Sequence, residues 1–228
     1  LSDTYHHKHG VGVLQGPTLA GKSTVLRQFR NTLGADVYTT ITDARGLTPT
    51  GLLKSILKQF GYPLELKSVN ELINMVRVVS MQRAAAGNPP LLIIENSHLL
   101  SADILALLCE LTDFKASRQS AIRLILSCQQ NIEGLSGDPN TASMAERVTG
   151  VHRIRPMVLL ETRDYLHAKL YAAGAMAPAS LFPENVCVDI HMASGGWPGI
   201  VDRLACFGLA KADSAPVTPG LIERRRLP

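Results

Sequence analysis

Short runs of consecutive apolar residues alternate, over residues 10–155, with longer stretches in which apolar residues recur every three or four positions. The short runs predict buried strands, and the longer stretches predict amphipathic helices. This alternation is typical of an α/β domain in which helices cover both faces of a parallel sheet. The predicted strands are residues 11–15, 36–41, 91–94 and 122–127. The predicted helices are residues 24–30, 49–60, 69–86 and 101–112.

The pattern changes near Arg155, after which no further strand is predicted. We therefore expect an α/β core over residues 1–155 and a small all-helical domain over residues 156–212. Prolines and charges beyond that domain favour a linker or tail over residues 213–228. Glycine and proline separate the three helices of the second domain, which are predicted at residues 161–173, 183–193 and 198–211.

Composition limits the class of protein without identifying it. The 228 residues are enough for one or two domains with a substantial core, and no apolar run approaches the length of a membrane span. The chain starts at Leu1 rather than methionine, so a targeting or membrane segment can lie outside it. The four cysteines lie far apart in apolar segments, which favours buried reduced thiols and a cytoplasmic location. The net charge of +4 is mildly basic and does not itself indicate nucleic-acid binding.

The segment between the first predicted strand and the first predicted helix carries the most specific motif of the chain. It fits the phosphate-binding pattern G-x-x-x-x-G-K-[ST] at every fixed position. In such a loop, backbone N–H groups and the helix N-terminus face the phosphates, Lys22 contacts the outer phosphates, and the Ser23 hydroxyl ligates Mg²⁺. The alternative is a glycine-rich turn that happens to carry a lysine. The candidate nucleotide-binding residues are Gly16, Pro17, Thr18, Leu19, Ala20, Gly21, Lys22, Ser23 and Thr24.

Enzymes with such a loop also need a carboxylate at the end of a buried strand to support the Mg²⁺ ion. Glu95 directly follows the apolar run of residues 91–94 and is the candidate for this metal role. One alternative is an exposed carboxylate at a strand end. In another alternative, Glu95 serves the attacking water while Glu110 or Asp113 holds the metal.

Four further segments have the composition and order of motifs from one ATPase superfamily: residues 95–100, 122–129, 146–148 and 194–199. With these motifs the chain resembles an AAA+ ATPase and is most similar to the ExeA/GspA-type ATPases of the bacterial general secretion pathway. Pilus-assembly and TniB-like transposition ATPases have a similar pattern. The resemblance covers residues 10–212 and implies a P-loop NTPase core followed by a helical AAA+ lid.

The resemblance implies roles for particular residues of the core. Glu95 takes the place of the family's Mg²⁺-supporting aspartate, and Asn96 takes the place of its catalytic glutamate. A polar sensor ends the fourth predicted strand, where we prefer Gln129 to Ser127 because Ser127 still alternates with the strand. Arg147 corresponds to an arginine that acts across a subunit boundary. The alternative for Arg147 is a solvated side chain between a loop and a helix.

Besides Glu95, two further departures from the family's motifs concern the chemistry. An amide at Asn96 can orient a water molecule but is no base. The lid motif Ser-Gly-Gly-x-Pro-Arg has Gly199 in its last position, which removes a cation near the γ-phosphate. Arg203, one helical turn further on, is a candidate to replace that arginine. We therefore expect tight ATP binding with slow hydrolysis, so that occupancy acts as a structural switch.

Three functions stay open at this point. The first is an AAA+ domain that binds ATP and ADP with Mg²⁺, forms a homo-oligomer and, as the resemblance implies, serves the assembly of an envelope machine such as a secretin or pilus. It would contact a membrane only through segments outside this chain. The second is a DNA-associated regulator of the transposition type, which ranks lower because the chain is only mildly basic. The third is a nucleotide-binding scaffold without catalysis.

Overall fold

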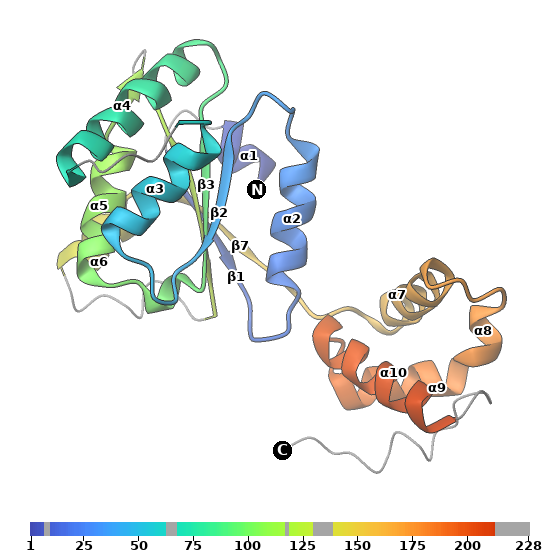
Figure 1. Cartoon of the computed structure of the whole chain (residues 1–228). Coiled ribbons are helices and arrows are strands. Elements are labelled where there is room, and N and C mark those ends of the chain that lie inside the picture. The colour runs from blue at the N-terminus through green and yellow to red at the C-terminus, as the bar shows by residue number, and fades with distance from the viewer. Residues whose placement is uncertain (7–9, 63–67, 117–118, 130–138, 213–228) are drawn as a thin grey trace. The chain divides into compact units, whose positions relative to one another are not determined.

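The protein divides into two compact units, seen in a computed structural model that describes residues 1–6, 10–62, 68–116, 119–129 and 139–212 (Figure 1). The first unit runs from Leu1 to Ile154 except for Thr18–Gly21. The second unit consists of Thr18–Gly21 and the chain from Arg155 onward. The predicted linker over residues 213–228 lies outside the described residues.

A parallel sheet forms the centre of the first unit (Figure 1). Its five strands are β1 (Val11–Gln15), β2 (Thr39–Asp43), β3 (Leu91–Glu95), β6 (Arg123–Cys128) and β7 (Val148–Arg153). They lie in the order β2-β3-β6-β1-β7, and because every neighbouring pair is parallel, their carboxyl ends meet at one edge. The register places Asp43 beside Glu95 and Gln15 beside Cys128 at that edge. A separate antiparallel pair joins β4 (Lys115–Ala116) to β5 (Gln119–Ser120).

Helices cover both faces of the sheet, as the sequence predicts (Figure 1). They are α1 (Ser2–His6), α2 (Lys22–Thr32), α3 (Pro49–Gln59), α4 (Val69–Ala85), the 3₁₀ turn η1 (Ser97–Leu99), α5 (Ala102–Thr112) and α6 (Pro139–Glu146). Side chains along β3 alternate between the two faces. Leu92 and Ile94 join a buried cluster with residues of α3, α4 and α5, whereas Leu91 and Ile93 join a second cluster with residues of α1 and α2.

Two strands differ from the prediction. The second predicted strand begins at Asp36, but β2 begins only at Thr39, because Gly34–Val37 forms a turn closed by a hydrogen bond from Val37 N to Gly34 O (3.0 Å). The strand β7 is absent from the prediction. Its side chains alternate between half-buried and exposed, as befits a strand at the end of the sheet, so it lacks a continuous apolar run.

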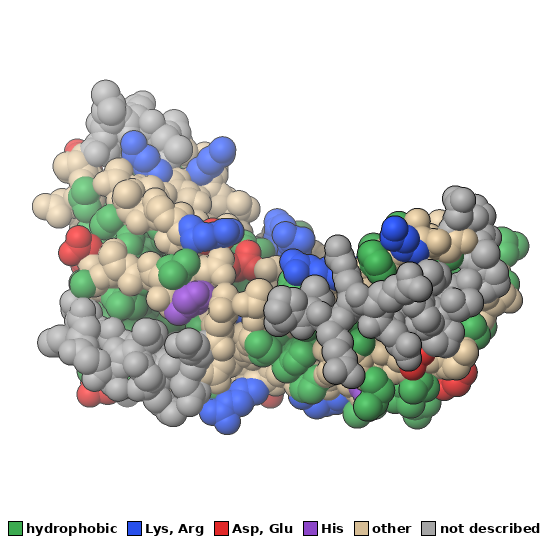
Figure 2. All heavy atoms as spheres, turned by 90° about the horizontal axis from the view of Figure 1, so that it is seen from below, with side chains coloured by type: hydrophobic (Ala, Val, Ile, Leu, Met, Phe, Trp, Pro, Cys, Tyr) green, Lys and Arg blue, Asp and Glu red, His purple; other side chains and the backbone are tan. Residues whose placement is uncertain are grey.

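The second unit is helical, as the sequence predicts. Its elements are α7 (Leu159–Ala172), α8 (Pro178–Leu181), α9 (Glu184–Ser194) and α10 (Pro198–Ala212), of which the short α8 is not among the predicted helices. Phe182, Val186, Ile190 and Val201 are fully buried in its core. Hydrophobic atoms also lie at its surface in Figure 2, and its exposed large apolar residues are Val158, Leu160, Tyr171, Met176, Met192 and Leu209.

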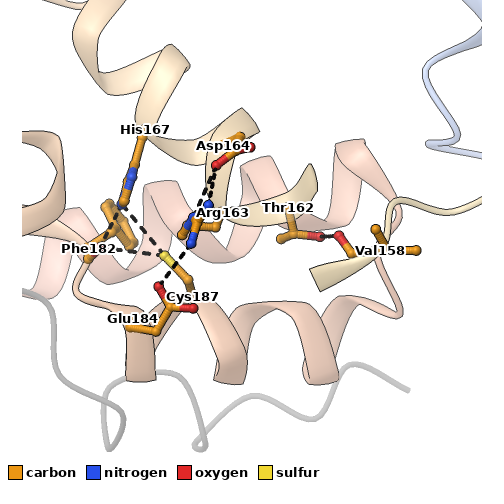
Figure 3. Close-up of polar contacts among 8 residues, drawn as sticks. All are labelled: Val158, Thr162, Arg163, Asp164, His167, Phe182, Glu184 and Cys187. Atoms are coloured by element: carbon orange, nitrogen blue, oxygen red, sulfur yellow. Dashed lines mark hydrogen bonds and ion pairs between the residues drawn. The ribbon is translucent and has the colours of Figure 1, made fainter. Parts of the chain in front are cut away.

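Polar contacts between α7 and the segment from Phe182 to Cys187 add to this core (Figure 3). The guanidinium of Arg163 binds Asp164 at 2.9 Å and Glu184 at 3.6 Å, while His167 Nε2 lies 2.9 Å from the Phe182 carbonyl oxygen. The Cys187 thiol lies 3.8 Å from the same His167 nitrogen. That nitrogen donates to Phe182 O, so it is not free to take the thiol proton, and the pair is a packing contact rather than a reactive dyad.

Cysteine labelling distinguishes buried from exposed thiols in this protein. Three cysteines are buried as predicted, but the prediction is wrong for Cys206, which is exposed on α10. Burial raises the pKa of the Cys187 thiol to about 11, and burial also raises the pKa of Cys128. Because the thiolate is the nucleophile, we expect iodoacetamide at about pH 8 to alkylate Cys206 in the native protein and the other three only after denaturation. Mass spectrometry of the labelled peptides checks this, and native labelling of Cys187 at the rate of Cys206 would contradict it.

In the described part of the chain, no helix has both the length and the apolar character that crossing a membrane requires.

Candidate functional site

The motif at residues 16–23 forms the connection between β1 and α2 (Figure 1). Gly16 N donates to Cys128 O at 3.3 Å, which ties the loop to the end of β6. Leu19 and Gly21 have left-handed backbone conformations, with φ of 66° and 86°. A left-handed leucine is uncommon and costs conformational energy, a feature that clusters at functional loops.

Lys22 is the first residue of α2, and its side chain folds back over the loop. Its Nζ donates to Gly16 O at 2.7 Å and to Pro17 O at 2.8 Å. Partial burial lowers the pKa of Lys22, opposed by the nearby Cys128 and Glu95. The ammonium is thus held at the loop by two carbonyl oxygens. A phosphate group offers stronger, charged acceptors at this place, so the loop fits a nucleotide.

Ser23 and Glu95 meet beside the loop. The Ser23 hydroxyl, from the first turn of α2, donates to Glu95 Oε1 at the end of β3. A hydroxyl and a carboxylate oxygen are the kind of donors that Mg²⁺ prefers in nucleotide sites. The two alternative acids, Glu110 and Asp113, lie on and just after α5 and bind Arg77 (3.7 Å) and Arg147 (2.8 Å). The residues present at the loop therefore fit a Mg²⁺ ion held by Ser23 and Glu95.

Asn96 follows Glu95 in a left-handed conformation, with φ of 55°. Its side chain Nδ2 donates to Asp43 Oδ2 at 2.9 Å, across the ends of β3 and β2. Arg45 binds the same carboxylate through its Nε and Nη2 atoms at 2.6–3.1 Å. These hydrogen bonds, led by those of Arg45, hold the pKa of the Asp43 carboxyl well below its usual range, so Asp43 is ionised at neutral pH.

No motif of the sequence points to Asp43 or Arg45, whose side chains interact beside Asn96 at this edge of the sheet. A signal for Asp43 exists, because an aspartate closes a strand whose carboxyl end lies at the same edge as Glu95. The prediction ended that strand two residues early, at Ile41. With the strand placed at residues 39–43, the aspartate stands next to the candidate metal carboxylate.

The candidate sensor follows the carboxyl end of β6, at the same edge of the sheet as Glu95, whereas the candidate trans-acting arginine directly precedes β7. Gln129 is exposed directly after β6, whereas Ser127 is buried within the strand and its carbonyl accepts from Ser97 Oγ at 3.0 Å. Arg147 lies between α6 and β7 rather than at the start of a helix. Its guanidinium binds Asp113 at 2.8 Å and Ser143 O at 2.7 Å, and its own carbonyl oxygen accepts from Val11 N at 3.0 Å. The roles of Gln129 and Arg147 stay predictions.

Gly199 and Arg203 lie on α10 in the second unit. Gly199 N donates to Leu19 O at 2.9 Å, and a Cβ atom at position 199 would lie 2.7 Å from Leu19 Cβ. This close approach requires glycine and excludes an arginine in the present backbone position. Arg203 is exposed one turn further along, and its contact with a nucleotide stays a prediction.

A family model described as an AAA domain matches residues 5–135, which includes the phosphate-binding loop, β2 and the Glu95–Asn96 pair. The chain belongs to the AAA domain family. This AAA domain is also 23% identical, over 204 residues, to General secretion pathway protein A from Aeromonas hydrophila. The match covers 89% of the chain but only 37% of the relative, so the chain spans well under half of that protein.

Solved structures share the fold of this AAA domain. The ORC2 protein of Aeropyrum pernix, crystallised as ADPNP–ADP complexes, aligns with a TM-score of 0.67 at 14% identity over 95% of this chain and 61% of that chain. The RuvB Holliday junction branch migration motor of Thermotoga maritima aligns with a TM-score of 0.60 at 16% identity over 94% of this chain and 60% of that chain. At such identities the likeness shows the fold, a P-loop core with a helical C-terminal region.

Proposed function

We propose that this AAA domain binds ATP with Mg²⁺ and hydrolyses it slowly, so that nucleotide occupancy acts as a switch. One observation carries the proposal: Lys22 Nζ lies over the loop while the Ser23 hydroxyl meets the Glu95 carboxylate beside it. Lys22 would hold the outer phosphates, and Ser23 and Glu95 would hold the metal. When bound, Mg²⁺ supplies charge neutralisation on the phosphate oxygens.

The slow rate follows from Asn96 and Gly199. Asn96 takes the place after Glu95 where the resemblance leads us to expect a glutamate, and its amide is committed as a donor to Asp43. Gly199 removes the cation expected on the lid. Groups that stabilise developing charge are each worth orders of magnitude in phosphoryl transfer, so their loss favours long-lived ATP binding over rapid turnover.

The proposal for the partners of this domain is based on a similar protein and not on the geometry of the site. General secretion pathway protein A is named for a secretion pathway, which supports a role in the assembly of a bacterial envelope machine. We propose that the domain forms a homo-oligomer on the cytoplasmic side and reaches the membrane through segments outside this chain. The helical unit exposes several large apolar side chains, among them Met176 and Met192, that an interface between copies would cover.

Titration with a fluorescent ATP analogue tests the nucleotide and metal parts together. With Mg²⁺ present, we expect Ser23→Ala to weaken ATP binding about 10-fold, because one oxygen ligand of the metal is lost. With EDTA instead, the variant and the unmodified protein are expected to bind alike. Ser55→Ala on α3 serves as a matched control that keeps both affinities.

Three outcomes would contradict the proposed function. Absence of binding in the unmodified protein rejects a nucleotide site. Equal affinities of Ser23→Ala and the unmodified protein in Mg²⁺ reject the assigned metal ligand. A steady-state turnover near the enzyme average of about 10 s⁻¹ rejects the slow switch.

A further inference from the structure

Three neighbouring residues at one edge of the sheet offer two carboxylates and one amide. Glu95 and Asp43 end adjacent parallel strands in direct register, and Asn96 follows Glu95. The 2.9 Å hydrogen bond from Asn96 Nδ2 to Asp43 Oδ2 closes the group. The Asp43 carboxylate therefore contacts the side chain of Asn96, the residue at the position where the resemblance leads us to expect a glutamate.

The two side chains differ in what they can do for a water molecule. A carboxylate only accepts hydrogen bonds and can direct a water's lone pair at phosphorus by holding its protons. The Asn96 amide can accept through its oxygen but carries no charge to favour the loss of a proton. Of these two residues, Asp43 is the one with the chemistry that hydrolysis needs, and the left-handed turn at Asn96 brings the amide against it.

Arg45 occupies much of the acceptor capacity of that carboxylate. Its backbone N donates to Asp43 Oδ1 at 2.8 Å, and its guanidinium spans both carboxylate oxygens. The Arg45 side chain is 72% exposed, so the ion pair is screened by water and breaks at little cost. An exposed arginine on this carboxylate competes with a water molecule for the same oxygens.

We propose that Asp43 is the residue that orients the attacking water in this AAA domain, that Asn96 positions Asp43, and that Arg45 restrains it. The proposal rests on the proposed function, since it assigns a residue to the hydrolysis of bound ATP. In the step, the water oxygen bonds to the γ-phosphorus while the bridging P–O bond breaks. The electron pair of that bond leaves with ADP, and the proton lost by the water ends on the released phosphate.

A carboxylate–amide exchange tests this assignment. Asp43→Asn is expected to lower single-turnover hydrolysis by about 100-fold or more, which is the lower end of the range for loss of a water-activating group. The double variant Asp43→Asn with Asn96→Glu returns a carboxylate to the pair and is expected to recover at least the unmodified rate. Asn96→Glu alone sets two carboxylates side by side, and its single-turnover rate is expected to be lower than that of the double variant. Asp36→Asn, in the turn before β2, is the control.

Binding measurements provide a readout that does not depend on turnover. Asp43→Asn is expected to bind the fluorescent ATP analogue within about threefold of the unmodified protein, because Asp43 acts after ATP is bound. Its affinity for ADP with aluminium fluoride, which imitates the phosphoryl group in transfer, is expected to fall by about the factor seen in the rate. Thermal melting compares the folding of all variants.

Each result decides a separate part. An unmodified protein that fails to bind the ATP analogue rejects the proposed function itself. If the Asp43→Asn variant binds and hydrolyses ATP as well as the unmodified protein does, the role of Asp43 is overturned. A folded double variant no faster than Asp43→Asn overturns it as well, because a carboxylate at either position is then not what hydrolysis needs. Arg45→Gln is expected to raise the rate about threefold or more, and an unchanged rate overturns the restraint by Arg45.

Discussion

Replacing Lys22 by methionine is expected to weaken ATP binding by at least about 100-fold. The side chain keeps its apolar stem but loses the only charge of the loop itself. Charge-assisted hydrogen bonds to phosphate are worth about 1.5–3 kcal/mol each, and about 2.7 kcal/mol corresponds to 100-fold. Titration with the fluorescent ATP analogue in Mg²⁺ measures the loss directly.

The folding of this variant is expected to change little. Burial lowers the pKa of Lys22, which means that the folded protein holds the charged form at some cost. Removing the charge offsets the loss of the two hydrogen bonds to loop carbonyls, so the melting temperature without nucleotide should stay within a few degrees. Lys58→Met, at an exposed position near the end of α3, is the matched control. An ATP affinity of Lys22→Met within threefold of the unmodified protein would exclude a phosphate role for this lysine.

Gly196→Ala is expected to unfold the helical unit or to destabilise it by more than about 4 kcal/mol. Gly196 has φ of 76°, and its carbonyl oxygen accepts from Met157 N at 2.9 Å. A Cβ atom at this position would overlap the Met157 carbonyl oxygen and lie 3.1 Å from two further backbone atoms of Met157. Because the clash is with backbone rather than a flexible side chain, the segment before α7 must move.

The neighbouring glycine supplies the control. Gly195 is also left-handed, with φ of 58°, but among the described residues a Cβ atom there meets only Trp197, at 3.8 Å. Gly195→Ala therefore carries the conformational cost alone, about 1 kcal/mol. The chain has one tryptophan, Trp197, so its fluorescence reports unfolding of the helical unit by itself. Equal urea midpoints for the two variants would show that the backbone clash at Gly196 is relieved at no cost.

The parts of the site that the sequence predicts are those that local pattern encodes. The loop of residues 16–23 has fixed residues at fixed spacing, and Glu95 ends an uninterrupted apolar strand, so both could be placed without knowing the fold. The start of α3 is encoded locally in the same way, because Thr48 caps it with a side chain that accepts from Gly51 N at 3.1 Å. Such signals depend on residues near one another in the chain.

The missed parts depend on pairing between distant segments. The sequence can show that Asp43 closes a strand, but its position beside Glu95 comes from the register of β2 with β3, which no spacing within the chain reveals. The need for glycine at position 199 arises from Leu19, 180 positions earlier, and the ion pair of Arg147 arises from Asp113. Burial alternates along the edge strand β7, but the residue types in VTGVHR do not: Val151 is exposed and His152 is half-buried, so no alternation of polar and apolar residues marks the strand in the sequence.

Arg147 has a consequence for how a neighbouring molecule and ATP affect each other. Its carbonyl oxygen holds Val11, the first residue of the strand that leads into the phosphate-binding loop, while its guanidinium holds Asp113. Any group that draws the guanidinium away from Asp113 thus acts on the backbone four residues before the loop-bearing strand ends. If that changes the affinity for ATP by some factor, thermodynamic linkage requires ATP to change the affinity for that group by the same factor. Measuring either affinity with and without the other ligand then gives the coupling energy of both.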